Sequence, residues 1–237
     1  MQEHVDHLTT HGFCVLKNFF PTEFIEKLKA INAEHRITKP LDTWQTGLEL
    51  YDLYTDKTLI DSLTVMGCTE LKFRSSFYIN KFPGEVRRPW HQDWFAWDEP
   101  VSKQVFPFQI GIMIYFCRTD ETNGCLEVIP GSHRKFMEIA EPDQPHPDGI
   151  HVKVEPGDVL IADARLLHAT GANTSSADRP MMTMWYYPNW SLFTQQFRAW
   201  NAIRDSAWEK LGSLLPTSSD PPCDFKVRRA TTREDYP

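Results

Sequence analysis

Hydrophobic and polar positions in the N-terminal part of the chain follow a helical spacing. A short helix is expected to end at Gly12, because glycine is the usual residue just past a helix C-terminus, and the apolar run "FCVL" that follows is expected to form a strand. The segment "PTEFIEKLKAIN" opens with proline, a favoured first residue of helices, and places apolar side chains on one face: Phe24, Leu28 and Ile31. A second helix is therefore predicted there.

The pattern changes in the middle of the chain, where short β-rich runs are separated by Pro, Gly, Asn and Asp turns. These runs are "KFRSSFYINKF", "FPFQIGIMIYF", "CLEVI", "HVKV", "DVLIA" and "MMTMWYY". Many short strands without alternating helices predict an antiparallel sandwich or barrel. Near the end, one helical face is predicted to carry Phe193, Phe197, Trp200 and Ile203. The proline-containing tail from Pro216 is either packed on the body or disordered.

Composition narrows the class of protein. The chain has 237 residues, 41% hydrophobic and 24% charged, which predicts one globular domain over residues 1–237. A net charge of −7 argues against nucleic acid or an anionic membrane as a partner. We expect no transmembrane helix and no signal peptide, because no apolar run is long enough and the start "MQEHVDHLTT" is polar. Five scattered cysteines without a CxxC pair predict free thiols and a cytoplasmic location. We expect a small-molecule partner and a monomer or weak homo-oligomer.

The first chemical signal lies in "RPWHQDWFAW", where His91 and Asp93 stand two apart among aromatic residues. Burying an unpaired carboxylate is costly, so Asp93 needs a partner, and a metal ion is one. In a strand, residues i and i+2 point to the same side, so both side chains would enter a barrel together. Iron(II) in oxygenases takes two histidines and one carboxylate on one face, which calls for another histidine.

Most of the nine histidines are poor candidates for that third ligand. Three could line one face of the N-terminal helix and chelate a metal, but without a carboxylate or cysteine partner a solvated face is the favoured interpretation: His4, His7 and His11. Three more stand in or beside turn-rich segments and are expected at the surface: His133, His146 and His151. His168 is a better candidate for the third ligand, because it follows the apolar segment "PGDVLIADARLL".

Arg179 stands eleven residues after His168 and opens the apolar strand "MMTMWYY". A hairpin through the polar turn "GANTSSAD" is expected to bring Arg179 back beside the strand that carries His168. An arginine entering an apolar barrel needs an anion, and a carboxylate is its best match. A small dicarboxylate could chelate iron at one end and meet Arg179 at the other, and 2-oxoglutarate has that shape.

Taken in order, these segments resemble the phytanoyl-CoA dioxygenase-like family of iron(II)- and 2-oxoglutarate-dependent oxygenases. The resemblance runs from "GFCVLKNFF" to the strand after Arg179 and is carried by "INKFPG", "WHQD", "NGCLEVIPGSH" and "HATGANTSSADR". An HxD pair alone is weak evidence. The pair followed by NGxLxVIPGSH, and then by a histidine with arginine at plus eleven, is specific.

The resemblance implies a mainly β fold, a double-stranded β-helix (jelly-roll) core over about residues 70–190 with helical flanks. It implies iron bound by His91, Asp93 and His168, with Arg179 on the distal carboxylate of 2-oxoglutarate. Further cosubstrate contacts are implied, with a structural hydrogen-bonding role as the alternative for each: Thr170, Asn80 and Gln109. Met113 stands where relatives often have tryptophan, so the cosubstrate wall is expected to differ here.

The implied reaction uses Fe(II), 2-oxoglutarate and O2, and oxidises a small-molecule substrate with release of succinate and carbon dioxide. Halogenating relatives have glycine or alanine in place of Asp93, so the retained carboxylate favours hydroxylation or a related oxidation. Strand alternation also sends Phe95 and Trp97 inward, either as an aromatic substrate wall or as ordinary core. Four cations either meet an anionic substrate or are simply solvated: Arg74, Lys81, Arg87 and Arg88.

Two other classes of function remain open. One is a non-catalytic jelly-roll binding protein, and the other is a cupin-type metal dioxygenase that does not use 2-oxoglutarate. Retention of all three ligands argues against the first, and Arg179 argues against the second.

Overall fold

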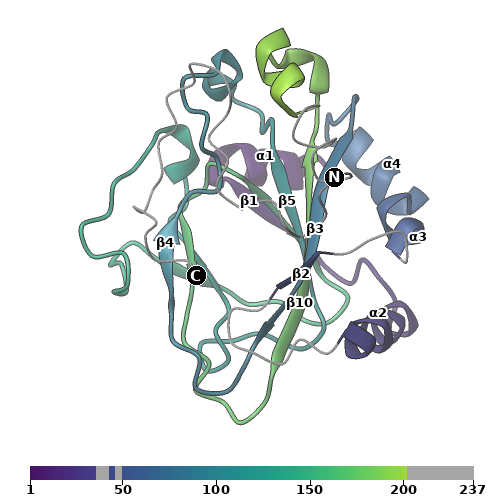
Figure 1. Ribbon diagram of the computed structural model, residues 1–237, viewed down its shortest axis with the longest axis vertical. Helices are drawn as coiled ribbons and strands as arrows, with labels where there is room; N and C mark the ends of the chain where they lie inside the picture. The colour runs from purple at the N-terminus through teal and green to yellow at the C-terminus, as the bar shows by residue number, and fades with distance from the viewer. Residues whose placement is uncertain (36–42, 46–49, 202–237) are drawn as a thin grey trace.

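Two antiparallel sheets face each other in the computed structural model, which describes residues 1–35, 43–45 and 50–201 (Figure 1). The large sheet has the strand order β1-β8-β5-β10-β3-β2. Its strands are β1 (Phe13–Leu16), β8 (Val159–Asp163), β5 (Ile110–Tyr115), β10 (Arg179–Tyr187), β3 (Lys72–Lys81) and β2 (Thr43–Gln45). The small sheet has the order β4-β9-β6-β7 and consists of β4 (Arg88–His91), β9 (His168–Thr170), β6 (Leu126–Val128) and β7 (Ile150–Val152). The predicted jelly-roll core is confirmed.

Helices cover the outer face of the large sheet, as Figure 1 shows for α2, α3 and α4. They are α1 (Gln2–His11), α2 (Thr22–His35), α3 (Tyr51–Tyr54) and α4 (Lys57–Val65). The predicted end of α1 is confirmed, because Gly12 adopts a left-handed φ of 86° and its N–H bonds Leu8 O. Leu28 of α2 and Leu59 of α4 pack in one buried cluster with alternate side chains of the sheet.

The strand β5 is buried on both faces, which explains why it reads as an unbroken apolar run. Ile112 and Ile114 face the helices, whereas Met113 and Tyr115 face the space between the two sheets. There they meet Leu126 of the small sheet and other apolar side chains. Alternation along the strands therefore decides which side chains belong to the barrel interior.

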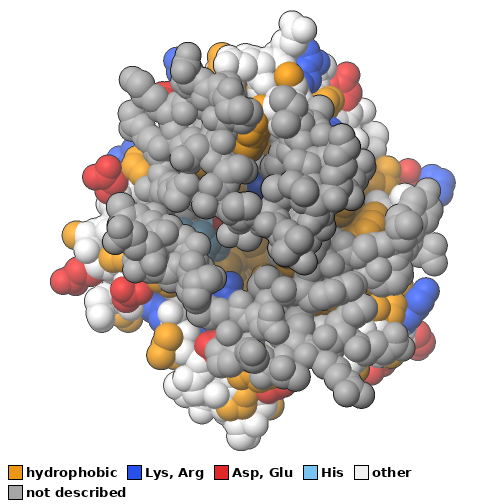
Figure 2. Space-filling model, in the orientation of Figure 1, with side chains coloured by type: hydrophobic (Ala, Val, Ile, Leu, Met, Phe, Trp, Pro, Cys, Tyr) orange, Lys and Arg blue, Asp and Glu red, His pale blue; other side chains and the backbone are white. Residues whose placement is uncertain are grey.

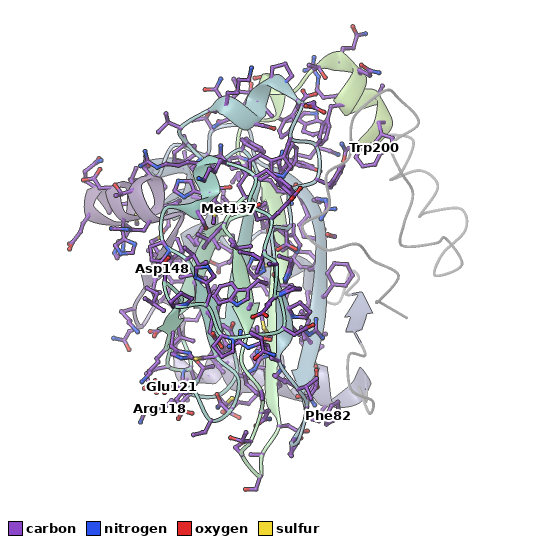
Figure 3. All side chains as sticks on the ribbon, turned by 90° about the vertical axis from the view of Figure 1, so that its left-hand side faces the viewer. Phe82, Arg118, Glu121, Met137, Asp148 and Trp200 are labelled. Carbon is purple, nitrogen blue, oxygen red and sulfur yellow. The ribbon has the colours of Figure 1, made fainter. Side chains whose placement is uncertain are left out.

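An aromatic cluster packs near one end of the barrel. Trp94 and Phe108 lie at its centre with Phe193, Phe197 and Trp200. Short 3₁₀ helices at Pro100–Lys103 and Trp190–Leu192 and a helix at 195–201 belong to this region. Figure 3 places Trp200 near one end of the sheets and Phe82 near the opposite end. Of the predicted helical face, Phe197 and Trp200 lie on the helix at 195–201, whereas Phe193 precedes that helix in extended backbone and packs in the same cluster. Ile203 and the tail from Pro216 lie outside the described residues.

One histidine expected at the surface is buried. His133, in the 3₁₀ helix Ser132–Arg134, is only 2% exposed, and its Nε2 lies 3.2 Å from Thr9 O. The absence of a side chain at Gly12 lets the ring pack there, since a Cβ at that position would lie 2.7 Å from His133 Nδ1. The turn signals around His133 gave no indication that α1 would cover it.

The four described cysteines are free thiols: Cys14, Cys68, Cys117 and Cys125. Across the described part of the chain, no helix is both long enough and apolar enough to cross a membrane.

Gly124 follows β5 and packs closely against the neighbouring backbone, whereas Gly84 follows β3 and has a nearly equal φ angle. The pair provides a matched test of packing at Gly124. Gly124 has φ 76° and Gly84 has φ 79°. A Cβ on Gly124 would lie 2.5 Å from Gly171 O, whereas a Cβ on Gly84 meets nothing within 4 Å. Gly84→Ala should cost about 1–2 kcal/mol of backbone strain, and Gly124→Ala about 2 kcal/mol more. Urea denaturation of both variants measures the difference, and equal losses would contradict the close approach.

Candidate metal centre

His91, Asp93 and His168 converge at one point of the barrel. One ligand atom from each residue lies within 4.8 Å of the others, and within the described residues this is the only such group of His, Cys, Asp or Glu side chains. Asp93 Oδ2 lies 3.3 Å from His168 Nε2, and Asp93 Oδ1 lies 3.6 Å from His91 Nε2. The N-terminal histidines do not form a second group. The predicted ligand set is thus brought together in space.

Strand pairing and one amide position the three ligands. His91 ends β4 and lies opposite His168, the first residue of β9. Between His91 and Asp93, the buried Gln92 side chain donates to Lys135 O at 3.0 Å and to Arg165 O at 2.5 Å. Its Oε1 accepts from Met137 N at 2.9 Å. Gln92 therefore ties the segment that carries two ligands to the surrounding loops.

Both histidine rings are held in the orientation that a metal requires. His91 Nδ1 lies 2.8 Å from Pro89 O, and His168 Nδ1 lies 2.9 Å from Leu166 O. A carbonyl oxygen only accepts, so each Nδ1 carries the proton and each Nε2 keeps a free lone pair. This backbone support is the usual arrangement behind a metal-bound imidazole.

The electrostatics of the group fit a cation. Burial, assisted by the charge of His168, lowers the pKa of His91 to about 4, so the ring is neutral at neutral pH. The Nε2 atoms of both histidines then lie close to the Asp93 carboxylate, at 3.6 Å for His91 and 3.3 Å for His168, an arrangement that a positive ion would stabilise. Two imidazoles and one carboxylate with open positions are the donor set of non-haem iron(II).

Arg179 is the second feature of the interior. It is 2% exposed, and its Nε and Nη1 are buried without a hydrogen-bond partner. Its guanidinium lies over the Tyr115 ring at 5.2 Å from the centroid. Burial lowers the pKa of Arg179, yet a guanidinium stays charged in proteins. A buried, charged fork with free N–H groups is suited to bind an anion.

The expected hairpin between His168 and Arg179 is wrong. His168 belongs to the small sheet, whereas Arg179 opens β10 of the large sheet, where its register partner is Lys81 of β3. Residues 171–178 thus cross from one sheet to the other. Arg179 therefore lies on the opposite sheet from His168 instead of on the neighbouring strand.

Lys81 is a buried cation of the interior that our list of cosubstrate contacts omitted. Its Nζ donates to Val86 O at 2.8 Å and lies 3.5 Å from Thr170 Oγ1. Burial lowers the pKa of Lys81 to about 8. Thr170, two residues after His168 on β9, therefore lies close to Lys81. A lysine ending the apolar strand "FYINK" was the signal available in the sequence.

The other two suggested cosubstrate contacts differ in their placement. Asn80 is the neighbour of Lys81 on β3 and so points to the opposite face, where its amide donates to Asp178 Oδ2 at 3.0 Å. Gln109 immediately precedes β5 and shares the alternation of Met113, with its buried Oε1 lacking a partner. The structure therefore brings Gln109, and not Asn80, to the interior face.

Phe95 and Trp97 lie beyond the end of β4, yet the alternation in exposure continues through them. Trp94 and Ala96 are buried, whereas Asp93, Phe95 and Trp97 are partly exposed. Phe95 stacks on Trp94 at 5.6 Å between ring centroids and meets Trp200 edge-on at 5.3 Å. Trp97 meets Phe136 edge-on, and its buried Nε1 has no hydrogen-bond partner.

The metal group is accessible to solvent. The side chain of Asp93 is 28% exposed and that of His91 is 25% exposed. Figure 2 shows a histidine side chain together with basic side chains recessed near the centre of the face on view.

Comparisons with known proteins identify a family model and curated relatives that match this chain. The family model described as phytanoyl-CoA dioxygenase (PhyH) matches residues 33–181. A probable phytanoyl-CoA dioxygenase of Caenorhabditis elegans is 31% identical over 134 residues, which cover 46% of this chain and 40% of the relative. The chain thus spans less than half the length of that curated relative.

Solved structures share the fold. The crystal structure of AviO1 from Streptomyces viridochromogenes matches with a TM-score of 0.63 at 22% identity, over 78% of this chain and 94% of the other. The structure of HygX from Streptomyces hygroscopicus with nickel, 2-oxoglutarate and hygromycin B matches with a TM-score of 0.64 at 17% identity. That match covers 79% of this chain and 87% of HygX.

Metal binding should stabilise the folded protein through the three converging side chains. We expect nickel(II), used as a probe, to raise the melting temperature of the wild type, because a ligand at a hundredfold its Kd adds about 2.7 kcal/mol. His168→Ala should lose this response, while His146→Ala, outside the metal group, should keep it. An equal nickel response in His168→Ala and wild type would contradict the ligand assignment.

Proposed function

Because the chain belongs to the phytanoyl-CoA dioxygenase family, we propose that it is an Fe(II)- and 2-oxoglutarate-dependent dioxygenase acting on a small molecule. The single observation that carries the proposal is the pair of unsatisfied groups that face each other across the barrel. One is the metal triad with bare lone pairs, and the other is the Arg179 guanidinium with unpaired N–H groups.

His91, Asp93 and His168 would hold iron(II), and Arg179 would bind the distal carboxylate of 2-oxoglutarate. Lys81 adds a second positive charge beside Arg179, and Thr170 offers a hydroxyl between them and the metal group. Gln109 is the remaining candidate contact, since its Oε1 lacks a partner. Iron with 2-oxoglutarate and O2 supplies an oxidising equivalent and releases succinate and carbon dioxide.

The protein's own side chains orient and shield this chemistry. Pro89 O and Leu166 O fix the two rings, and Gln92 holds the segment between the ligands. The apolar interior around Met113 excludes water from the cosubstrate side. Asp93 keeps the carboxylate that a halide would replace, so hydroxylation or a related oxidation is the proposed outcome.

Each of the two alternative functions, a non-catalytic binding protein and a dioxygenase that does not use 2-oxoglutarate, leaves part of the site without a role. A non-catalytic binding protein does not account for a complete set of two histidines and one carboxylate, and a dioxygenase without 2-oxoglutarate does not account for the buried Arg179. An anaerobic titration with iron(II) and 2-oxoglutarate separates all three. The proposal expects a weak visible charge-transfer band, which forms only when the two chelate together.

Replacing Arg179 should weaken cosubstrate binding without loss of metal. Wild-type protein should release succinate from 2-oxoglutarate only with iron(II) and oxygen. Arg179→Gln should raise the KM for 2-oxoglutarate roughly thirtyfold, equivalent to about 2 kcal/mol for a desolvated charged hydrogen bond. The nickel-dependent melting shift should stay unchanged.

Arg118→Gln is the matched control, because the Arg118 side chain is 69% exposed. A normal KM in Arg179→Gln would remove Arg179 from the cosubstrate site. Loss of the nickel response in that variant would show that the substitution disturbs the fold.

Phe95 and Trp97 are proposed to line the substrate side of the metal. Trp97→Phe keeps a ring but removes the unpartnered N–H, so it should lower the yield of oxidised substrate per succinate while leaving the melting temperature nearly unchanged. Phe95→Ala should lower both the yield of oxidised substrate per succinate and the melting temperature, because Phe95 also stacks on Trp94. Unchanged coupling in both variants, with a lower melting temperature, would assign the two residues to the core.

A further inference from the structure

An irregularity in β4 turns an additional arginine into the barrel. Arg88 pairs with Thr170 and His91 pairs with His168, so three steps along β4 match two steps along β9. Residues three apart in a regular strand point to opposite faces, but a bulge between them restores the same face. Register partners share a face, and His168 and Thr170 both face the interior. Arg88 therefore faces the interior with His91.

Arg88 has no side-chain partner among the residues that the structure describes. No ion pair or hydrogen bond joins it to another residue in the described part of the chain. Its positive charge lowers the pKa of His91, of Lys81 and of Arg179, so it lies within electrostatic range of the metal group and of the cosubstrate side.

The neighbouring Arg87, in contrast to Arg88, has an ion-pair partner. Arg87 donates from Nη2 to both oxygens of Glu127, each at 2.6 Å, and lies over the Trp90 ring. Trp90 packs with Ala169 and Leu167 on the outer face of the small sheet. Adjacent arginines thus point to opposite faces, one paired outside and one unpaired inside.

The charges of the site do not balance with metal and cosubstrate alone. The interior cations are Lys81, Arg88 and Arg179, and the carboxylates near them are Glu85 and Asp93. A divalent metal and a dianionic cosubstrate offset each other, so one positive charge remains. A partly buried positive charge without a partner favours a further anion.

Arg88 is better placed for the substrate than for the cosubstrate. Arg179 and Lys81 are each 2% exposed, whereas Arg88 is partly open to solvent. A group that is partly exposed and close to His91 can be reached by a molecule that enters from outside. A guanidinium also matches the planar oxygens of a carboxylate or phosphate in a bidentate pair.

We propose that Arg88 binds an anionic oxygen group of the substrate, a carboxylate or a phosphate, so that the enzyme selects an acidic small molecule. The inference rests on the proposed function, because it takes the metal and 2-oxoglutarate as bound. It narrows the substrate class and gives a specific role to an arginine that is otherwise unpaired.

Binding of simple probes tests this without knowledge of the natural substrate. Benzoate, phenyl phosphate and neutral benzamide are titrated by calorimetry into anaerobic protein loaded with iron(II) and 2-oxoglutarate. We expect at least one of the two anions to bind at least tenfold more tightly than benzamide while the charge-transfer band persists. Which anion binds more tightly distinguishes a carboxylate from a phosphate.

Arg88→Gln should abolish the preference for the anion, Arg88→Lys should retain part of it, and the exposed-site control Arg134→Gln should keep all of it. Arg88→Gln removes an unpaired cation, so its melting temperature should be no lower than that of the wild type. Anion binding that is unchanged in Arg88→Gln, or absent from the wild type, would overturn the proposal.

Loss of the band on adding benzoate would also overturn it, because the anion would then displace 2-oxoglutarate. Absence of the band before any probe is added contradicts the proposed function instead. In that case titration of the nickel-loaded protein still decides whether Arg88 binds an anion.

Discussion

The burial of the Arg179 guanidinium without a carboxylate partner is the constraint on which the rest of the site depends. Removing such a charge from water costs several kcal/mol; the cation–π contact with the Tyr115 ring offsets only part of this cost, and the neighbouring Lys81 offsets none of it. A second cation beside the first makes the cost greater. The fold accepts this because β10 is held centrally between β5 and β3 in the large sheet. Burial of Arg179 thus lowers the stability of the folded protein but leaves a buried cation in position for the proposed anion.

Because residues 171–178 cross from the small sheet to the large one, Arg179 and His168 lie on opposite sheets. Facing sheets lie about 10 Å apart, so groups on opposite sheets leave room for a small molecule between them. With His168 on one sheet and Arg179 on the other, a diacid can satisfy both ends at once. A hairpin would have placed the two side chains on adjacent strands, too close for such a ligand to lie between them.

The sequence predicted the local parts of the site better than the non-local ones. His91 and Asp93 could be found because two residues two apart share a face, and His168 because an apolar run precedes it. The sheet that receives Arg179 could not be predicted, because strand pairing is a long-range choice that turn composition does not encode. His133 was misplaced for the same reason, since its cover comes from α1, far away in the chain. Asn80 was suggested as a cosubstrate contact, but its side chain lies on the other face of β3, where its amide donates to Asp178.

The bulge in β4 would link the proposed metal ligand His91 with the proposed substrate-binding Arg88. Pro89 lies between the paired residues Arg88 and His91, and it has no N–H to donate to the ladder. Its carbonyl accepts from His91 Nδ1, which fixes the tautomer that leaves Nε2 free for metal. The same extra residue reverses the alternation and turns Arg88 inward. Straightening the strand would therefore change the metal ligand and the anion-binding arginine together, so the two functions are expected to depend on one backbone irregularity.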